Sequence, residues 1–82
     1  MEETIKSEVV IFGTPTCHYC SVAKQYMRDK KIDYKYIDVK EDLEQRKQMI
    51  ELSGQMGVPV IKVNSHILKG WDEDMFTNVY ER

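Results

Sequence analysis

Cys17 and Cys20 are the residues of this sequence whose type and spacing point most directly to chemistry. Two thiols separated by two residues suit thiol–disulfide exchange, in which one thiolate attacks a disulfide and the second thiol releases the product. A disulfide between them would close a loop of only four residues, which stabilises a fold by roughly 2 kcal/mol before strain is subtracted. An inert domain with two unreactive thiols is therefore the weaker interpretation.

A zinc site is another use of two cysteines at this spacing. The sequence has no second cysteine pair, so a four-ligand site would need both His18 and His66. His18 lies between the cysteines, where its side chain is poorly placed to reach the same metal. We therefore expect no metal site, and we expect His66 to be an ordinary surface residue.

The segment around the cysteines is typical of a buried strand followed by a helix. Val9 to Phe12 are apolar and mostly β-branched, and the turn-forming residues 13–15 follow at once. Thr16 is predicted to cap a helix that runs to about Lys30. Its buried stripe consists of Cys20, Ala23 and Met27. The Cys17 sulfur would then lie at the helix N-terminus, where unpaired backbone N–H groups and the helix dipole stabilise a thiolate.

The middle of the chain predicts a second strand and a second helix. The strand is expected from Ile32 to Val39, and the helix from Asp38 or Glu41 to Ser53, with a stop at Gly54. The helix is mostly polar, and its expected apolar anchors are Leu43, Ile50 and Leu52.

The C-terminal third predicts a hairpin and a last helix. Apolar segments at 58–63 and 66–69 flank the short turn Asn64-Ser65. Asp72 is a good cap for the helix that follows. The expected inward face of that helix consists of Met75, Phe76, Val79 and Tyr80. The order β-α-β-α-β-β-α predicts an α/β structure, and we expect residues 1–82 to form one domain.

Composition excludes several classes of function. The net charge of −2 provides no basic surface for nucleic acid. The longest apolar runs are too short to span a membrane, and the first four residues do not resemble a secretion signal. We therefore expect a cytoplasmic protein without nucleic-acid or membrane partners. We also expect it to be a monomer.

Three motifs give the chain a resemblance to the glutaredoxin family. They are Thr14-Pro15-Thr16-Cys17-His18-Tyr19-Cys20, Gly57-Val58-Pro59 and Gly70-Trp71-Asp72. The resemblance implies a thioredoxin-like fold with a four-stranded mixed sheet and three helices. It also implies a thiol–disulfide oxidoreductase active in electron transport and redox homeostasis, with Cys17 attacking and Cys20 resolving. Glutathione would be a co-substrate, disulfide-containing proteins would be partners, and no cofactor would be tightly bound.

The resemblance also assigns residues to glutathione. In the family the proline corresponding to Pro59 is cis, and the backbone of the residue corresponding to Val58 pairs with the cysteinyl part of glutathione. The γ-glutamyl end would meet Gly70, Trp71, Asp72 and Glu73, and the active-site loop would add Thr16, His18 and Tyr19. Plainer roles are a helix cap for Asp72, an aromatic cover over the core for Trp71 and a solvated side chain for His18.

The sequence departs from the common family pattern at four positions. Thr14 stands where many members have lysine, and His18 stands where proline is common between the cysteines. Gly57 replaces a frequent threonine, and Lys69 replaces one glycine of a frequent pair. The missing lysine removes one cation from the expected surroundings of the ligand carboxylate.

Two other functions remain open within the resemblance. One is a redoxin that donates electrons, for example to ribonucleotide reductase, and is recharged by thioredoxin reductase. The other is an iron–sulfur module in which two chains each contribute Cys17 and glutathione completes the ligands.

Overall fold

The computed structural model describes residues 8–80 as a four-stranded mixed sheet with three helices. The strands are β1 (Val9–Gly13), β2 (Lys35–Asp38), β3 (Val60–Val63) and β4 (His66–Lys69). The helices are α1 (His18–Asp29), α2 (Leu43–Ser53) and α3 (Glu73–Tyr80). This order confirms the predicted fold class. The first four residues, which do not resemble a secretion signal, lie outside the described residues. Both ends of the predicted 1–82 domain lie outside them as well.

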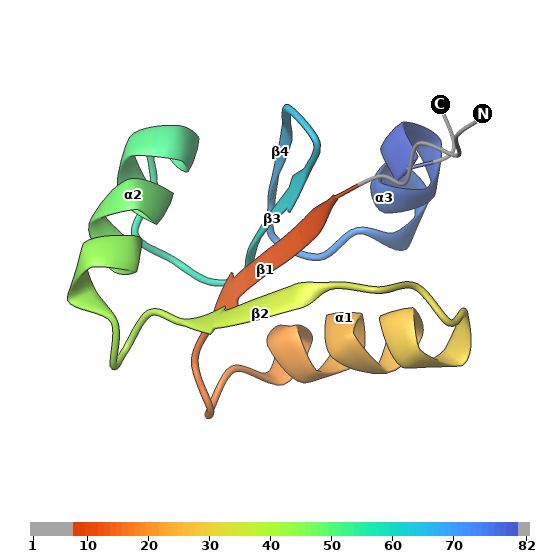
Figure 1. Cartoon of the computed structure of the whole chain (residues 1–82), viewed down its shortest axis with the longest axis horizontal. Helices are drawn as coiled ribbons and strands as arrows, with labels where there is room; N and C mark the ends of the chain where they lie inside the picture. Colours follow the sequence, from red (N-terminus) through yellow and green to blue (C-terminus); the bar gives the residue numbers. More distant parts are fainter. Residues whose placement is uncertain (1–7, 81–82) are drawn as a thin grey trace, which may run out of the picture.

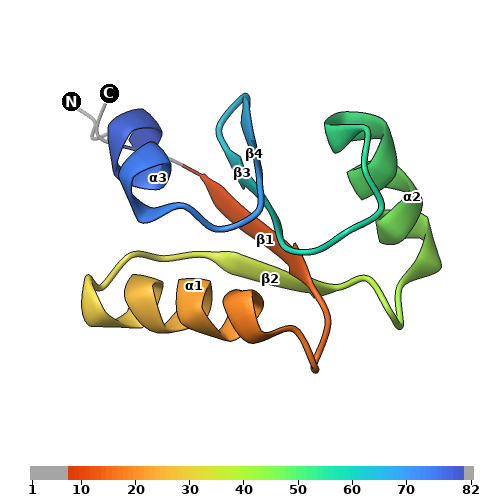
Figure 2. The ribbon, with the colours of Figure 1, turned by 180° about the vertical axis from the view of Figure 1, so that it is seen from behind.

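The strands lie in the order β2-β1-β3-β4, with β1 parallel to β2 and antiparallel to β3. β3 and β4 form the expected antiparallel hairpin around Asn64-Ser65. The parallel β1–β2 pair needs a crossover, and α1 supplies it, running alongside β2 (Figure 1). Figure 2 shows the same arrangement from behind, with α2 well separated from α1 and α3.

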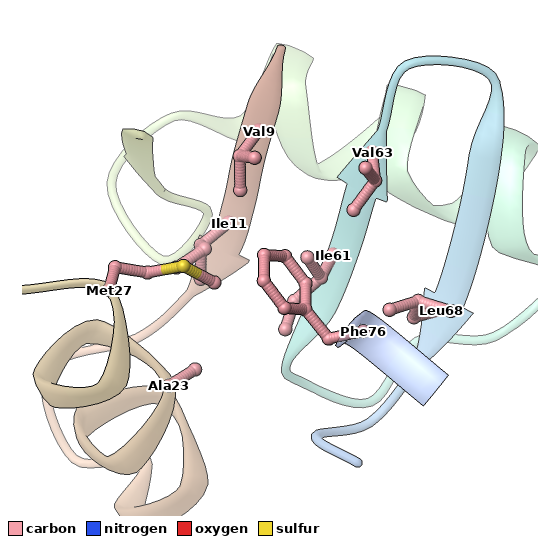
Figure 3. Close-up of a cluster of buried hydrophobic side chains, with 8 residues drawn as sticks. All are labelled: Val9, Ile11, Ala23, Met27, Ile61, Val63, Leu68 and Phe76. Atoms are coloured by element: carbon pink, nitrogen blue, oxygen red, sulfur yellow. The ribbon is translucent and has the colours of Figure 1, made fainter. Parts of the chain in front are cut away.

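The two faces of the sheet carry separate hydrophobic clusters. On one face, α1 and α3 pack against alternate residues of β1 and β3 (Figure 3). The buried members of this first cluster are Val9, Ile11, Ala23, Met27, Ile61, Val63, Leu68 and Phe76. On the other face, Met49 of α2 joins Val10, Phe12, Val39 and Val60. β1 is buried on both faces, and it places the active-site loop at its C-terminal end.

Helix α1 begins at His18, one residue later than the start that a Thr16 cap would give. Cys17 is the N-cap, and its Sγ accepts a hydrogen bond from the backbone N–H of Cys20. The predicted cap Thr16 is wrong, because the turn ends in a hydrogen bond from Cys17 N to Thr14 O that leaves Thr16 exposed in the loop. The expected stripe is confirmed, since Cys20, Ala23 and Met27 are all buried.

Helix α2 buries a different side from the one predicted. Leu43 and Leu52 are exposed at its two ends, so two of its three expected anchors are wrong. Met49 is fully buried and Ile50 packs beside it at the edge of the second cluster. Gly54 ends the helix in the left-handed conformation at φ 74°, as predicted.

The remaining elements differ in smaller ways. β2 is shorter than the predicted Ile32–Val39, and α3 buries Phe76 while leaving Met75 half exposed. Met75 is therefore not part of the inward face. Within residues 8–80 no helix is long and apolar enough to cross a membrane.

Candidate active site

The strand register brings the three motifs to one end of the sheet. Phe12 of β1 lies opposite Val60 of β3, and Val60 lies opposite Lys69 of β4. The chain enters the cysteine motif just after Phe12, leaves the Val58-Pro59 motif just before Val60, and enters the Gly70-Trp71-Asp72 motif just after Lys69. A hydrogen bond of 2.9 Å from Gly70 N to Pro59 O joins the second and third motifs directly.

The two cysteines differ sharply in exposure. Cys17 is partly exposed at the start of α1, with the Cys20 N–H 3.1 Å from its sulfur. This N–H is one of the donors that a helix leaves unpaired at its start, and it favours negative charge on the sulfur. Cys20 is only 1% exposed. Cys17 is therefore the sulfur that a disulfide substrate can reach.

Burial also keeps Cys20 protonated. Loss of hydration raises the pKa of Cys20 to about 12, and the hydrogen bond and charge of Cys17 act in the same direction. The Thr14 backbone and the charge of Lys24 lower that pKa, but they do not offset the burial. In the resting state Cys20 is thus a thiol, which suits a second thiol that acts only after a mixed disulfide has formed.

Gly13 allows the close contact between β1 and the buried thiol. A Cβ atom at this position would lie 2.5 Å from the Cys20 sulfur and 3.2 Å from a ring carbon of Tyr36. Real side chains do not approach so closely, so only glycine fits here without a shift of its neighbours. The sequence indicated a turn at Gly13, but it gave no sign of this packing requirement.

The Val58–Pro59 peptide bond is cis, as the resemblance implied. Pro59 is buried and Val58 is half-buried beside the active-site loop. Val58 and Thr14 line the same surface hollow of about 360 Å³, together with residues of α2 and the loops on either side of it. Val58 therefore lies next to the cysteine motif, and its role in binding glutathione stays a prediction.

This hollow contains two cations that sequence reasoning missed. Lys40 and Arg46 line it, along with the exposed apolar side chains of Leu43 and Met56. Among the described residues, no acidic side chain lines it. Both cations come from α2 and the loop before it, outside the three motifs, so no sequence motif pointed to them.

The third motif has a well-defined structural role. Asp72 Oδ1 accepts hydrogen bonds from the N–H groups of Asp74 and Met75, so Asp72 caps α3 as expected. Asp72 and Glu73 are exposed and line a second, larger hollow of about 1290 Å³ between α3 and the C-terminal part of α1. Neither cysteine lines this larger hollow.

The aromatic residues near the site have different surroundings. The centre of the Trp71 ring lies 5.2 Å from the centre of the Tyr26 ring and 5.6 Å from that of Phe76. Trp71 therefore covers the first cluster. His18 and Tyr19 contact each other edge to face on the exposed side of α1. They are free to meet a substrate, and Trp71 has a packing role whether or not it also contacts a ligand.

Metal ligands do not gather in the described part of the chain. Among residues 8–80, no three His, Cys, Asp or Glu side chains lie close enough together to hold an ion. His66 is exposed at the start of β4, on the hairpin strand farthest from β2. The expectation that no metal binds stays a prediction.

Tyr36 of β2 is a further residue at the site that the sequence did not reveal. Its hydroxyl oxygen is buried and has no hydrogen-bond partner in the described part of the chain. Burial raises the pKa of Tyr36, and Asp38, Cys20 and Cys17 raise it further through their charges. The side chain that the sequence left without chemistry therefore lies within electrostatic reach of both thiols.

Comparison with known proteins agrees with this geometry. The Glutaredoxin family model matches residues 9–68. An uncharacterised glutaredoxin-like 8.6 kDa protein from Clostridium pasteurianum is 35% identical over 74 residues, covering 90% of this chain and 99% of the relative. Mitochondrial glutaredoxin-2 from Rattus norvegicus is 32% identical over 85% of this chain, but this chain spans only 47% of that relative's length.

Solved structures show the same fold at lower sequence identity. A glutaredoxin from Archaeoglobus fulgidus superposes with a TM-score of 0.80 at 21% identity, covering 93% of this chain and 87% of that one. The glutaredoxin-like NrdH-redoxin of Escherichia coli, described as having a thioredoxin-like activity profile, gives 0.74 at 19% identity, with 88% and 93% covered. A buckwheat glutaredoxin–glutathione complex gives 0.72 at 21% identity, with 89% and 69% covered.

The family match, the fold and the paired cysteines lead to one conclusion. The chain belongs to the glutaredoxin family and is a thiol–disulfide oxidoreductase.

Proposed function

We propose that this protein reduces protein disulfides and glutathione mixed disulfides, with glutathione as its reductant, Cys17 as nucleophile and Cys20 as resolving thiol. The observation that carries this proposal is the contrast between the two sulfurs. Cys17 is accessible and accepts an N–H hydrogen bond at the start of α1, whereas Cys20 is buried one turn further on. We also propose that it works as a monomer in a reducing compartment, such as the cytoplasm, where both thiols are regenerated.

The reaction begins with attack by the Cys17 thiolate on one sulfur of the substrate disulfide. A bond forms between Cys17 and that sulfur, and the other sulfur leaves as a thiolate that takes up a proton. The product is a mixed disulfide on Cys17. Since the Cys20 N–H donates to Cys17 Sγ, it favours the attacking charge before this step.

Two routes release the mixed disulfide. A glutathione thiolate can attack it directly and regenerate Cys17, or Cys20 can lose its proton and attack Cys17. The second route expels the substrate thiol and leaves a Cys17–Cys20 disulfide, which two glutathione molecules then reduce to the dithiol as they are oxidised to glutathione disulfide.

The hollow beside Val58 supports glutathione as the reductant. For a glutathione bound beside Val58, Lys40 and Arg46 would supply the positive charge for a carboxylate that Thr14 lacks. At the other motif, the exposed Asp72 carboxylate, whose Oδ1 caps α3, offers its negative charge to the ligand ammonium group. No tightly bound cofactor is needed for this chemistry.

The cysteine variants test the roles of both sulfurs. Cys17→Ser should abolish activity on every disulfide, because an alcohol is a far weaker nucleophile at neutral pH. Cys20→Ser should retain substantial activity on a glutathionylated peptide and lose most of its activity on protein disulfides. Steady-state rates with glutathione and glutathione reductase measure both, and activity that survives without Cys17 would overturn the mechanism.

A redoxin recharged by thioredoxin reductase is the second candidate. Its support is the fold shared with NrdH-redoxin and the replacement of the common family lysine by Thr14. In that case thioredoxin reductase would sustain turnover, glutathione would not, and Cys20→Ser would lose activity on both substrates. Parallel assays with the two reducing systems distinguish the candidates.

A further inference from the structure

Tyr36 presents an unpaired hydroxyl group at the buried side of the active site. Its oxygen is inaccessible to water and has no hydrogen-bond partner among residues 8–80, although buried hydroxyl groups nearly always have one. A phenylalanine would fill the same space without this cost. The unpaired donor therefore suggests a partner that forms during the reaction.

The Cys20 sulfur lies close to the Tyr36 ring. Parallel pairing places Tyr36 opposite Ile11, on the face of the sheet that α1 covers. The Cys20 sulfur and ring carbon Cε1 of Tyr36 both border the small space above Gly13, at 2.5 and 3.2 Å from the same point. Cε1 is bonded to the ring carbon that carries the hydroxyl group, so the hydroxyl lies in the neighbourhood of the sulfur.

Lys24 completes the group from the next turn of α1. Its Nζ lies 4.1 Å from the centre of the Tyr36 ring, a distance typical of a cation–π contact. Its positive charge also lowers the pKa of Cys20. The charged or titratable groups that act on Tyr36 and Cys20 from the adjoining elements are Cys17 at the N-cap of α1, Lys24 within α1 and Asp38 of β2.

We propose that Tyr36 is a positioning residue for the release step, and that its hydroxyl group donates a hydrogen bond to the Cys20 thiolate while Lys24 supports the same charge. In the mixed disulfide, Cys20 gives its proton to solvent and the Tyr36 O–H turns towards the sulfur. The Cys20 thiolate then attacks Cys17 and forms the Cys17–Cys20 bond. The bond from Cys17 to the substrate sulfur breaks, and the substrate leaves as a thiolate that takes up a proton.

This role explains why an unpaired donor is retained beside a buried thiol. A thiol accepts hydrogen bonds weakly, so the resting state leaves the Tyr36 hydroxyl unsatisfied. A buried thiolate needs a donor, and hydrogen bonds to charged groups are about twice as strong as neutral ones. The hydroxyl group thus favours the ionised form of Cys20 over the resting form, which is the difference that accelerates release.

The test is Tyr36→Phe, with release measured separately from attack. The inference rests on the proposed role of Cys20, so the substrate is a protein disulfide and each step is followed in a single turnover. Attack by Cys17 should be unchanged, and release should be about tenfold slower, as expected for loss of a hydrogen bond to a charged group. Lys24→Met should slow the same step, and Tyr34→Phe, two residues earlier and just before β2, should slow neither.

Two further measurements separate this role from a structural one. Removing an unsatisfied buried hydroxyl should leave the free energy of unfolding of Tyr36→Phe unchanged or increased, so a loss of stability would contradict the proposal. Release should accelerate as pH rises from about 6 to 9 in both proteins, because Cys20 must lose a proton, with the rate of Tyr36→Phe lower throughout.

The Cys20→Ser background distinguishes failure of this inference from failure of the proposed function. If Cys20→Ser leaves release unchanged, Cys20 is not the resolving thiol and the proposed function is wrong. If Cys20→Ser blocks release while Tyr36→Phe releases at the normal rate, only the role of Tyr36 is overturned. In the Cys20→Ser protein, adding Tyr36→Phe should not change turnover of a glutathionylated peptide, and a decrease there would show that Tyr36 acts elsewhere.

Discussion

Gly13 illustrates how a single missing side chain determines the geometry of the site. The buried thiol of Cys20 occupies the space in which any other residue would place its Cβ atom. Because this glycine has no special backbone angle, its requirement comes from packing and not from conformational freedom. The distance between β1 and the start of α1 therefore depends on this residue.

Gly13→Ala is expected to lower the free energy of unfolding by about 1–3 kcal/mol, the usual cost of adding a methyl group to a tightly packed core. Chemical denaturation of the reduced protein measures the loss. The cost should be smaller in a Cys20→Ala background, which removes the sulfur that the new methyl group would meet. Gly57→Ala is the control, because its nearest neighbour would lie 4.0 Å away. An equal cost at both glycines would contradict the packing argument.

Arg46 is the residue that best separates the glutathione proposal from a redoxin. Arg46→Ala should raise the KM for glutathione by about two- to tenfold, since one charge-assisted hydrogen bond to a carboxylate is lost. The effect should weaken at high salt, because the hollow is open to solvent. Lys47→Ala is the matched control, since Lys47 is exposed on the same helix and does not line the hollow. No change in KM with Arg46→Ala would favour another reductant.

At the scale of elements, helix α3 combines a structural and a proposed binding role in Asp72. Asp72→Ala should destabilise the protein by about 1 kcal/mol, since two N–H groups lose their acceptor. Asp72→Asn keeps an oxygen acceptor, so its stability should be close to that of the unaltered protein.

The glutathione affinity of Asp72→Asn then reports the effect of the carboxylate charge alone, because this variant keeps the oxygen that caps α3. Both Asp72 variants should bind glutathione more weakly if the carboxylate pairs with the ligand ammonium group. Asp74→Ala, in the same turn but without a capping bond among the described contacts, provides the control. Normal affinity in Asp72→Asn would restrict Asp72 to its capping role.

The elements themselves were largely predictable from local patterns. Cys20, Ala23 and Met27 have helical spacing and are apolar, so the inward side of α1 could be identified before the structure was known. Gly54 and Asp72 marked helix boundaries for stereochemical reasons that do not depend on the rest of the fold. Such signals are local, so the sequence alone was enough to predict these features.

The buried side of α2 could not be predicted in the same way. Its apolar residues are few and are spread around the helix, so the pattern specifies no single face. Leu43 and Leu52 are strongly hydrophobic, yet both are exposed. Met49 enters the core instead, because α2 packs over β1 and β3. That choice depends on tertiary packing, which no local pattern contains.

Part of the active site also depends on tertiary packing and could not be predicted from local patterns. The cysteine, cis-proline and Gly70-Trp71-Asp72 motifs were recognisable because each is contiguous in the sequence. Tyr36 and Arg46 come from elements that meet the motifs only through the β1–β2 pairing and the position of α2. Long-range pairing of this kind was needed to find them.

At the scale of the whole molecule, the buried thiol links the stability of the fold to pH. β1 is covered on both faces, and Cys20 lies where α1 closes over it. The pKa of Cys20 is raised to about 12, mainly by burial, whereas in the unfolded chain it is near the ordinary value of about 8.5. The folded state therefore binds the thiol proton more tightly than the unfolded state.

This difference predicts a loss of stability in alkali. Below about pH 8.5 the thiol is protonated in both states and its contribution is fully present, and the contribution is lost as pH rises towards about 12. The free energy of unfolding of the reduced protein should thus fall relative to Cys20→Ala across this window, with a slope of at most about 1.4 kcal/mol per pH unit. Denaturation with a phosphine reductant present measures the two proteins at each pH. All other residues are the same in both proteins, so the difference between the two curves reports the Cys20 thiol together with its effect on the charges of Cys17 and Tyr36. Parallel curves would mean that Cys20 ionises as easily in the folded protein as in the unfolded chain, and that the α1–β1 contact does not exclude water from the resolving thiol.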